Sequence, residues 1–246
     1  MRALRPGAYP RRPRLIAVRP ARQRLRTKID WLDSWHTFTF REHIDPRHMG
    51  FRALRVLNED RVAPGRGYGS HPHRDLELVT YVIDGTLHHQ DSLGTDTIVV
   101  PGGVQRICAG TGILHSESNG STVDSLHAIQ IWITPARTRL RPDYQQRAYP
   151  IAARRTAVTL LASSDGRDGS VKVHQDVAIF SSVLKPRECA TIAIESGRHA
   201  WVQVVSGVVV VNGESLSAGD GASVSDELAL EIASTSVSET LVFDLA

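Results

Sequence analysis

The stretch HPHRDLELVTYVIDG, residues 71–85, decides the fold class. It opens with two histidines two positions apart, continues into the strand-like run Leu76–Ile83, and ends at the dipeptide Asp84-Gly85. Valine, isoleucine, threonine and aromatic residues favour strands, and Asp-Gly favours a tight turn. The stretch therefore predicts a β-strand that carries paired histidines at its start.

Short strands separated by turns continue along most of the chain. They recur roughly every 8–12 residues, which is typical of sandwiches and barrels. Val208–Val211 is followed by Asn212-Gly213, a hairpin signal, and helical periodicity is hard to find. We therefore expect an all-β protein. The other predicted strands are Thr97–Val100, Ala128–Ile133, Val171–Val173, Ala178–Leu184, Thr191–Ile194 and Trp201–Val205.

The strands fall into two similar halves. The segment Pro135–Pro150 is rich in proline and charge and poor in apolar residues, which is typical of a linker. Leu78–Gly85 and Trp201–Gly207 share one pattern, a strand followed by a polar residue and a glycine. We expect two related barrels in tandem, spanning residues 29–140 and 141–246.

The positive charge of the chain is concentrated at its N-terminus. The formal net charge is +3, but residues 1–28 hold ten basic residues and no acidic one, so the remainder carries about −7. We expect a solvated, flexible extension over 1–28, of which about 15–28 can join the fold. A nucleic-acid contact is the alternative interpretation.

Neither secretion nor membrane insertion is predicted. No apolar run approaches the ~20 residues of a membrane helix, and no apolar segment marks a secretory signal. Cys108 and Cys189 lack the CxxC spacing of a zinc knuckle. We expect a cytoplasmic protein with reduced thiols, and a monomer in which the two barrels cover each other.

Two short histidine motifs predict a metal site. His71 and His73 project from the same face of a strand, because side chains alternate between faces. His115 and Glu117 repeat this spacing 44 residues later. If the two strands meet inside a barrel, three imidazoles and one carboxylate can converge on one ion. Such a donor set suits Fe(II), and also Mn, Ni, Cu, Zn or Co.

The glycines around these motifs resemble the two cupin motifs, with Gly65 and Gly85 around the first and Gly112 before the second. The segments HPHRDLELVTYVIDGTLHHQDSLGT (71–95), AGTGILHSE (109–117) and WLDSWHTFTF (31–40) resemble the pirin family of bicupins, especially its bacterial branch, in which quercetin 2,3-dioxygenase activity is known. The resemblance extends from about Leu15 to Ala246. It implies a bicupin whose metal ligands are His71, His73, His115 and Glu117, with Fe(II) favoured.

The resemblance bears on Glu77 and has one departure at the turn before the second motif. Many cupins take their carboxylate ligand from the first motif, which here is Glu77; we interpret Glu77 as a group that orients a ligand or holds the strand, with direct ligation as the alternative. Pirins usually carry an acidic residue before the second motif, where this chain has Gly102-Gly103-Val104-Gln105-Arg106. Arg106 can therefore alter the pocket wall.

The second half lacks the histidine pair. Ala193 and Glu195 stand at the corresponding positions, so we expect no metal there.

Several other residues have a structural interpretation beside a functional one. His88-His89 predicts a turn with one hydrogen-bonded imidazole rather than a second metal site. His127 is interpreted as a core histidine and Cys108 as a buried, inert thiol rather than an oxidation sensor. His36 and Phe38 belong to an aromatic strand that is expected to be mostly core, and both are candidates for lining the pocket.

The resemblance implies a dioxygenase that cleaves quercetin or another flavonol with O2, with Glu117 as the proton acceptor for the substrate hydroxyl. The alternative is a non-enzymatic, metal- or redox-sensing regulator that binds a protein partner through a charged patch, for which Arg106 is a candidate. A purely structural metal site is disfavoured, because such sites are usually closed and rich in cysteine.

Overall fold

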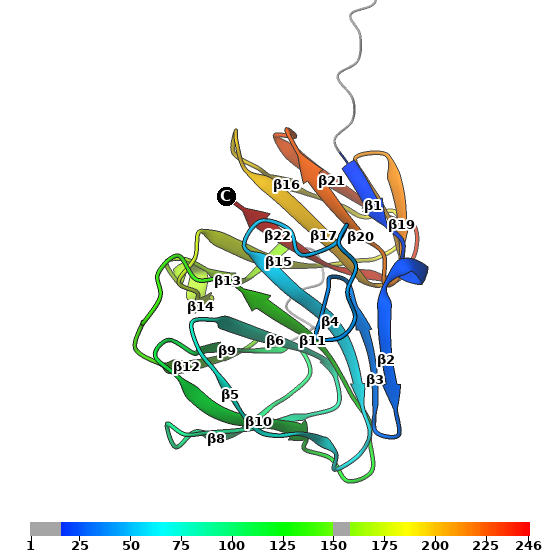
Figure 1. Cartoon of the computed structure of the whole chain (residues 1–246). Coiled ribbons are helices and arrows are strands. Elements are labelled where there is room, and N and C mark those ends of the chain that lie inside the picture. The colour runs from blue at the N-terminus through cyan, green and yellow to red at the C-terminus, as the bar shows by residue number, and fades with distance from the viewer. Residues whose placement is uncertain (1–15, 150–157) are drawn as a thin grey trace, which may run out of the picture.

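The structure, a computed structural model, describes residues 16–149 and 158–246. These residues form four sheets, two large and two small, and each half of the chain contributes mainly one of each kind (Figure 1). All strand pairs are antiparallel except β13 with β14. The prediction of two tandem cupin barrels in an all-β chain is confirmed.

The first half places a seven-stranded sheet opposite a four-stranded sheet. Across the large sheet the strands are β12 (Asp143–Ala148), β9 (Gly103–Cys108), β6 (Glu77–Asp84), β11 (Leu126–Ile133), β4 (Leu54–Val62), β3 (Leu32–His36) and β2 (Leu25–Ile29). Across the small sheet they are β5 (Gly67–His73), β10 (Ile113–Asn119), β7 (Leu87–Asp91) and β8 (Asp96–Val99).

The second half repeats this arrangement. Its large sheet contains β1 (Ile16–Arg19), β20 (Gly221–Ser225), β17 (His199–Ser206), β22 (Ser238–Leu245), β15 (Val177–Leu184), β13 (Val158–Ser163) and β14 (Val171–Lys172). Its small sheet contains β16 (Cys189–Ala193), β21 (Ala229–Ser234), β18 (Val208–Val211) and β19 (Glu214–Ser217). The helices of the described residues are the three-residue 3-10 segments η1 (Ala21–Gln23) and η3 (Arg167–Gly169), and neither could span a membrane.

Strand β6 is buried on both faces, which explains its nearly unbroken apolar sequence. On one face, Tyr81 belongs to a core cluster that also contains Trp201 and Phe243 of the second half. On the other face, Val82 packs with Leu87 inside the first barrel. The main core of the protein therefore lies between the two large sheets.

Apolar side chains fill the interior of the second barrel. They form a single cluster that includes Val202, Val204, Val209 and Leu230, each at most 1% exposed. The first barrel differs, because polar and titratable side chains occupy part of its interior.

The predicted linker is wrong over part of its length. Residues 143–148 form β12, an edge strand that pairs with β9 from Asp143↔Cys108 to Ala148↔Gly103. No residue of β12 is fully buried. An exposed edge strand of this kind needs no apolar residues, so its sequence resembles a polar connection.

The N-terminal segment joins both halves. Strand β1 pairs with β20 of the second half, whereas β2 pairs with β3 of the first. Between them, the Ala21 amide donates to Asp220 Oδ1 at 2.6 Å, and Arg24 forms an ion pair with Glu59 at 2.9 Å. The rest of the predicted extension, residues 1–15, lies outside the described residues. The division into domains stays a prediction.

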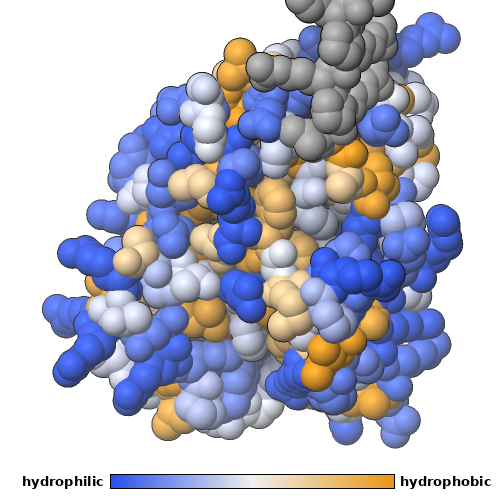
Figure 2. Space-filling model, turned by 45° about the horizontal axis from the view of Figure 1, so that its top comes forward, coloured by the Kyte–Doolittle hydropathy of each residue, from blue (hydrophilic) through white to orange (hydrophobic). Residues whose placement is uncertain are grey.

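Hydrophilic side chains predominate on the molecular face shown in Figure 2, where apolar residues lie in small separate patches. Scattered exposed apolar residues are ordinary on protein surfaces. The predicted monomeric state stays a prediction.

Candidate metal centre

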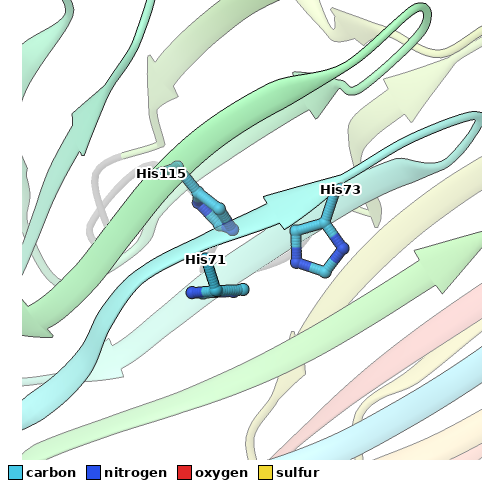
Figure 3. A group of neighbouring side chains, drawn as sticks. All are labelled: His71, His73 and His115. Atoms are coloured by element: carbon cyan, nitrogen blue, oxygen red, sulfur yellow. The ribbon is translucent and has the colours of Figure 1, made fainter.

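Strands β5 and β10 bring the three predicted histidine ligands together. His71 is the cross-strand partner of His115, and His73 is the partner of Ile113. The ring centroids lie 4.4 Å apart for His71 and His115, 4.9 Å for His71 and His73, and 5.0 Å for His73 and His115. Figure 3 shows the three rings gathered around a common centre. One nitrogen from each ring lies within 4.8 Å of the others, which makes a three-donor group.

The hydrogen bonding of these imidazoles fits a metal ion. His73 Nε2 and both ring nitrogens of His115 are buried and have no hydrogen-bond partner. Such atoms are rare in folded proteins and need an explanation. His71 Nδ1 lies 2.8 Å from the Gly69 carbonyl oxygen, which leaves Nε2 as the free nitrogen. A backbone contact of this kind fixes the tautomer of many metal-ligating histidines.

The charge state of the site also suits a cation. Burial, reinforced by neighbouring histidines, lowers the pKa of His73 to about 4 and that of His115 to about 3. Both rings are therefore neutral at neutral pH, and a neutral ring nitrogen has the lone pair that a metal requires.

Glu117 lies inside the barrel beside His115, as the H-x-E spacing predicts, and it is 4% exposed. Its Oε1 accepts hydrogen bonds from Gln105 and Thr80, and its Oε2 accepts one from Gln130 at 2.6 Å. Burial raises the pKa of Glu117 to about 7 despite these hydrogen bonds. Each carboxylate oxygen has two acceptor sites, so the bonded carboxylate keeps capacity for a cation.

The structure does not gather all four predicted ligands in one group. Glu117 groups with His115 and His89, and His115 is shared with the three-histidine group. The three histidines thus form the centre, and the carboxylate adjoins it through His115. The assignment of Glu117 as a ligand stays a prediction.

An irregularity in the β5–β10 pairing separates Glu117 from the histidines. His115 pairs with His71, but Glu117 pairs with Tyr68, so β5 has one extra residue between these pairs. Such bulges are common beside active sites, where they change the direction of a side chain. At Gly67 a Cβ atom would lie 2.4 Å from the Glu117 carbonyl oxygen, so the close approach of the strands requires glycine here.

His89 is a site residue that the sequence interpretation missed. The predicted turn at His88-His89 is wrong, because both residues lie in β7, where His89 is the cross-strand partner of Glu117. His89 is fully buried; its Nε2 lies 3.0 Å from Asp91 Oδ2, and its Nδ1 has no hydrogen-bond partner. The local sequence shows only that Leu87 and His89 are two positions apart and therefore share one face of a strand.

Glu77 and Arg106 lie outside the three-histidine group. Glu77 is buried at the start of β6, 3.1 Å from His174 Nδ1 of the second half, and does not group with the three histidines. Arg106 is fully buried and makes a two-point ion pair with Asp143. The prediction of Arg106 as part of an exposed charged patch is therefore wrong, and the regulatory alternative loses the feature that favoured it.

A row of aromatic side chains leads away from the histidines. The Trp132 ring lies 5.0 Å from that of His73 and 5.4 Å from that of Phe40, and Phe40 lies 5.0 Å from His36. His36 is 1% exposed, with its Nε2 2.9 Å from the Thr27 hydroxyl. Phe38 instead packs against Trp201 in the main core, so its predicted place in the pocket lining is wrong.

The structure agrees with the interpretation of His127 as a structural histidine and of Cys108 as a buried thiol. His127 Nε2 lies 3.0 Å from Glu59 Oε1, as expected of a satisfied structural histidine. Cys108 is 1% exposed, and burial together with Glu77 raises the pKa of its thiol to about 12.

A surface hollow of about 480 Å³ adjoins His73. Its lining also includes Pro72, Ser92, Ile113 and Leu114. The side chains of His71, His115 and Glu117 do not line this hollow.

Known proteins share both halves of this architecture. The family model described as Pirin matches residues 17–133, and the one described as Quercetinase C-terminal cupin domain matches residues 160–245. Quercetin 2,3-dioxygenase of Escherichia coli (strain K12) is 45% identical over 231 residues, which cover 94% of this chain and 99% of that protein. A pirin-like protein of Caulobacter vibrioides is 37% identical over 218 residues, 88% of this chain and 93% of that one.

A solved structure extends the similarity to three dimensions. The bacterial pirin YhhW from Escherichia coli, in complex with nickel(II), superimposes with a TM-score of 0.89 at 45% identity and covers 94% of this chain and 98% of that one. That relative binds a transition metal, which agrees with the donor group found here.

Proposed function

Because this chain belongs to the pirin family of metal-binding bicupins, we propose that it is a dioxygenase of the quercetin 2,3-dioxygenase type, which opens the central ring of a flavonol with O2. The observation that carries the proposal is the group of three imidazoles, with one donor nitrogen from each within 4.8 Å of the others, beside the buried carboxylate of Glu117. We further propose Fe(II) as the native metal, with Mn, Ni, Cu, Zn or Co as alternatives.

In this proposal His71, His73 and His115 hold the metal, and Glu117 completes the set at or beside it. A divalent metal in this position supplies Lewis acidity, which lowers the pKa of a substrate hydroxyl. Burial raises the pKa of Glu117 to about 7 in the metal-free protein, and a bound cation would favour its ionised form, so the carboxylate can accept a proton from the flavonol 3-hydroxyl. Gln105 and Gln130 hold the carboxylate in position through their side-chain amides.

The surroundings of the histidines suit a flat aromatic substrate. The Trp132 ring lies next to His73, and the Phe40 ring lies next to Trp132. Aromatic rings favour offset or edge-to-face contacts with other aromatic rings. We propose that these side chains orient the substrate, that the reaction takes place in the cytoplasm, and that the protein acts as a monomer.

The test is aerobic incubation of metal-loaded protein with quercetin. Turnover is measured as the loss of quercetin absorbance and as the release of carbon monoxide. We expect turnover by the wild type and none by His73→Ala/His115→Ala. His88→Ala is the matched control, because His88 lies in the same barrel and bonds Asp96 at the surface. Equal rates for the wild type and the double variant would remove the enzymatic proposal for this substrate.

A further inference from the structure

A second group of potential metal donors lies where the two halves meet. Glu77 begins β6 and is the direct cross-strand partner of Cys108 at the end of β9. His174 reaches them from the second half, two residues after β14. One donor atom from each of the three residues lies within 4.8 Å of the others. The group shares no residue with the three-histidine site.

The first-half members of this group are buried and incompletely bonded. Glu77 is fully buried and Cys108 is 1% exposed. Glu77 Oε1 lies 3.1 Å from His174 Nδ1, but Oε2 has no hydrogen-bond partner. The Cys108 thiol interacts with this carboxylate, which helps to raise the thiol pKa. A buried carboxylate oxygen without a geometric hydrogen-bond partner is costly, so Glu77 Oε2 is an acceptor that a bound cation would satisfy.

The nearest cation does not satisfy this oxygen. Arg106 Nε lies 3.9 Å from Glu77 Oε2, which is too long for a hydrogen bond. Arg106 Nε is itself buried without a hydrogen-bond partner. The terminal nitrogens of Arg106 are bound instead to both carboxylate oxygens of Asp143. If the Cys108 thiol ionises, Glu77, Asp143 and Cys108 carry three negative charges against the one positive charge of Arg106. One divalent cation neutralises the remaining two negative charges.

The group can be reached from solvent. The side chain of His174 is 26% exposed and lines a surface hollow of about 740 Å³ together with Asp143 and Tyr144. The Ala136 amide donates a hydrogen bond to the His174 carbonyl oxygen at 2.8 Å. This bond fixes the backbone at His174 against the segment that follows β11. An ion could therefore enter from the hollow, and a water molecule there could supply a further ligand.

We propose that Glu77, Cys108 and His174 form a binding site for a thiophilic divalent transition cation of the zinc class, which connects the two halves. Sulfur, imidazole nitrogen and carboxylate oxygen are all zinc donors, at ~2.0–2.3 Å from the ion. Tetrahedral donors at such distances lie roughly 3.5 Å apart. The separation of 3.1 Å between Glu77 Oε1 and His174 Nδ1 is close to this value, and Cys108 Sγ lies within 4.8 Å of both donors. The thiol proton leaves to water when the sulfur binds, and the ion replaces the His174–Glu77 contact.

Cobalt(II) is the probe, because a cobalt–thiolate bond gives a charge-transfer absorption band that imidazole and carboxylate ligands do not give. Full-length protein, stripped of metal, is titrated with Co²⁺ under reducing conditions. We expect two ions per chain and one thiolate band in the wild type. The band should disappear in Cys108→Ser and persist in Cys189→Ser, since Cys189 is exposed in β16.

Two more variants separate this site from the proposed catalytic site. His115→Ala should lose one ion and keep the thiolate band, whatever its effect on flavonol turnover. His174→Ala should weaken the cobalt affinity measured from the band by more than about tenfold. Because His174 is partly exposed, this variant still tests the proposal if Cys108→Ser fails to fold. A wild type without a thiolate band, or a band that survives in Cys108→Ser or is unchanged in His174→Ala, overturns the site.

Discussion

His71 and His115 are direct cross-strand partners in β5 and β10, and their ring centroids lie 4.4 Å apart. Each belongs to a pair of potential donors spaced two residues apart, so the pairing aligns both pairs on the barrel interior. A shift of the register by one residue would turn one pair to the opposite face of the sheet. The strand register is therefore as necessary to the site as the histidines themselves.

Replacement of Glu117 by glutamine should separate proton transfer from metal binding. Glu117→Gln keeps the three imidazoles and the side-chain shape but removes the proton acceptor. We expect kcat for quercetin to fall by roughly 10²–10⁴-fold with a small change in KM. Steady-state kinetics at equal metal content provide the measurement. Ser116→Ala is the control, because Ser116 lies between His115 and Glu117 on the opposite face; an unchanged kcat in Glu117→Gln would contradict the assigned role.

Gly67→Ala should disturb the strand irregularity beside Glu117. The new Cβ would lie 2.3 Å from Ser118 Cα, a backbone atom that can move only with its strand. We expect a loss of about 1–3 kcal/mol in the free energy of unfolding and lower metal occupancy.

Gly69→Ala is the matched control for this prediction, because it lies in the same strand and its Cβ would meet no atom within 4 Å. Urea unfolding and metal analysis of both variants supply the comparison. Similar effects of the two substitutions would show that the close approach at Gly67 is unimportant.

Gln130→Ala should weaken metal binding without removing a ligand. Gln130 Nε2 donates to Glu117 Oε2 at 2.6 Å and so fixes the carboxylate. Loss of a group that orients a ligand typically costs 10–100-fold, so we expect the metal dissociation constant to rise by about that factor. Competition with a chelator of known affinity gives the value. Gln90→Ala, which removes a surface hydrogen bond to Asp96, should leave it unchanged; equal losses in both variants would argue against a specific role.

The acid stability of the protein should depend on Glu59. Burial raises the pKa of this carboxyl group, but His127 and Arg24 outweigh burial and bring the pKa to about 2. A lowered folded-state pKa means that the ionised form stabilises the fold above the ordinary pKa near 4.5, and that this contribution is lost as the pH falls toward 2. It amounts to about 3 kcal/mol at neutral pH.

Urea unfolding of metal-free protein between about pH 3 and pH 7 tests this dependence. Glu59→Gln should be less stable than the wild type at pH 7, with the difference shrinking as the pH falls. Glu42→Gln, at an exposed carboxylate, should follow the wild-type curve. A constant difference between Glu59→Gln and the wild type at every pH would exclude the titration of Glu59 as its cause.

The sequence predicted the parts of the fold and site that depend on local pattern. The H-x-H and H-x-E spacings identified His71, His73 and His115 as neighbours, and the apolar runs identified most strands. Strand β12 was not predicted, because an exposed edge strand needs no apolar residues. His89 was not predicted as a site residue, because its position opposite Glu117 follows from the β7–β10 register, which the local sequence does not encode. The contact between Glu77 and His174 joins residues of different halves and has no local signal at all.

The pairing of β1 with β20 joins two segments that lie far apart in the chain. Ile16 lies opposite Val224. During synthesis, β1 therefore emerges from the ribosome long before its partner strand β20. Until then the growing protein exposes an unpaired strand, and closing such a distant contact is slow. We therefore expect β1 to pair only after β20 has been synthesised.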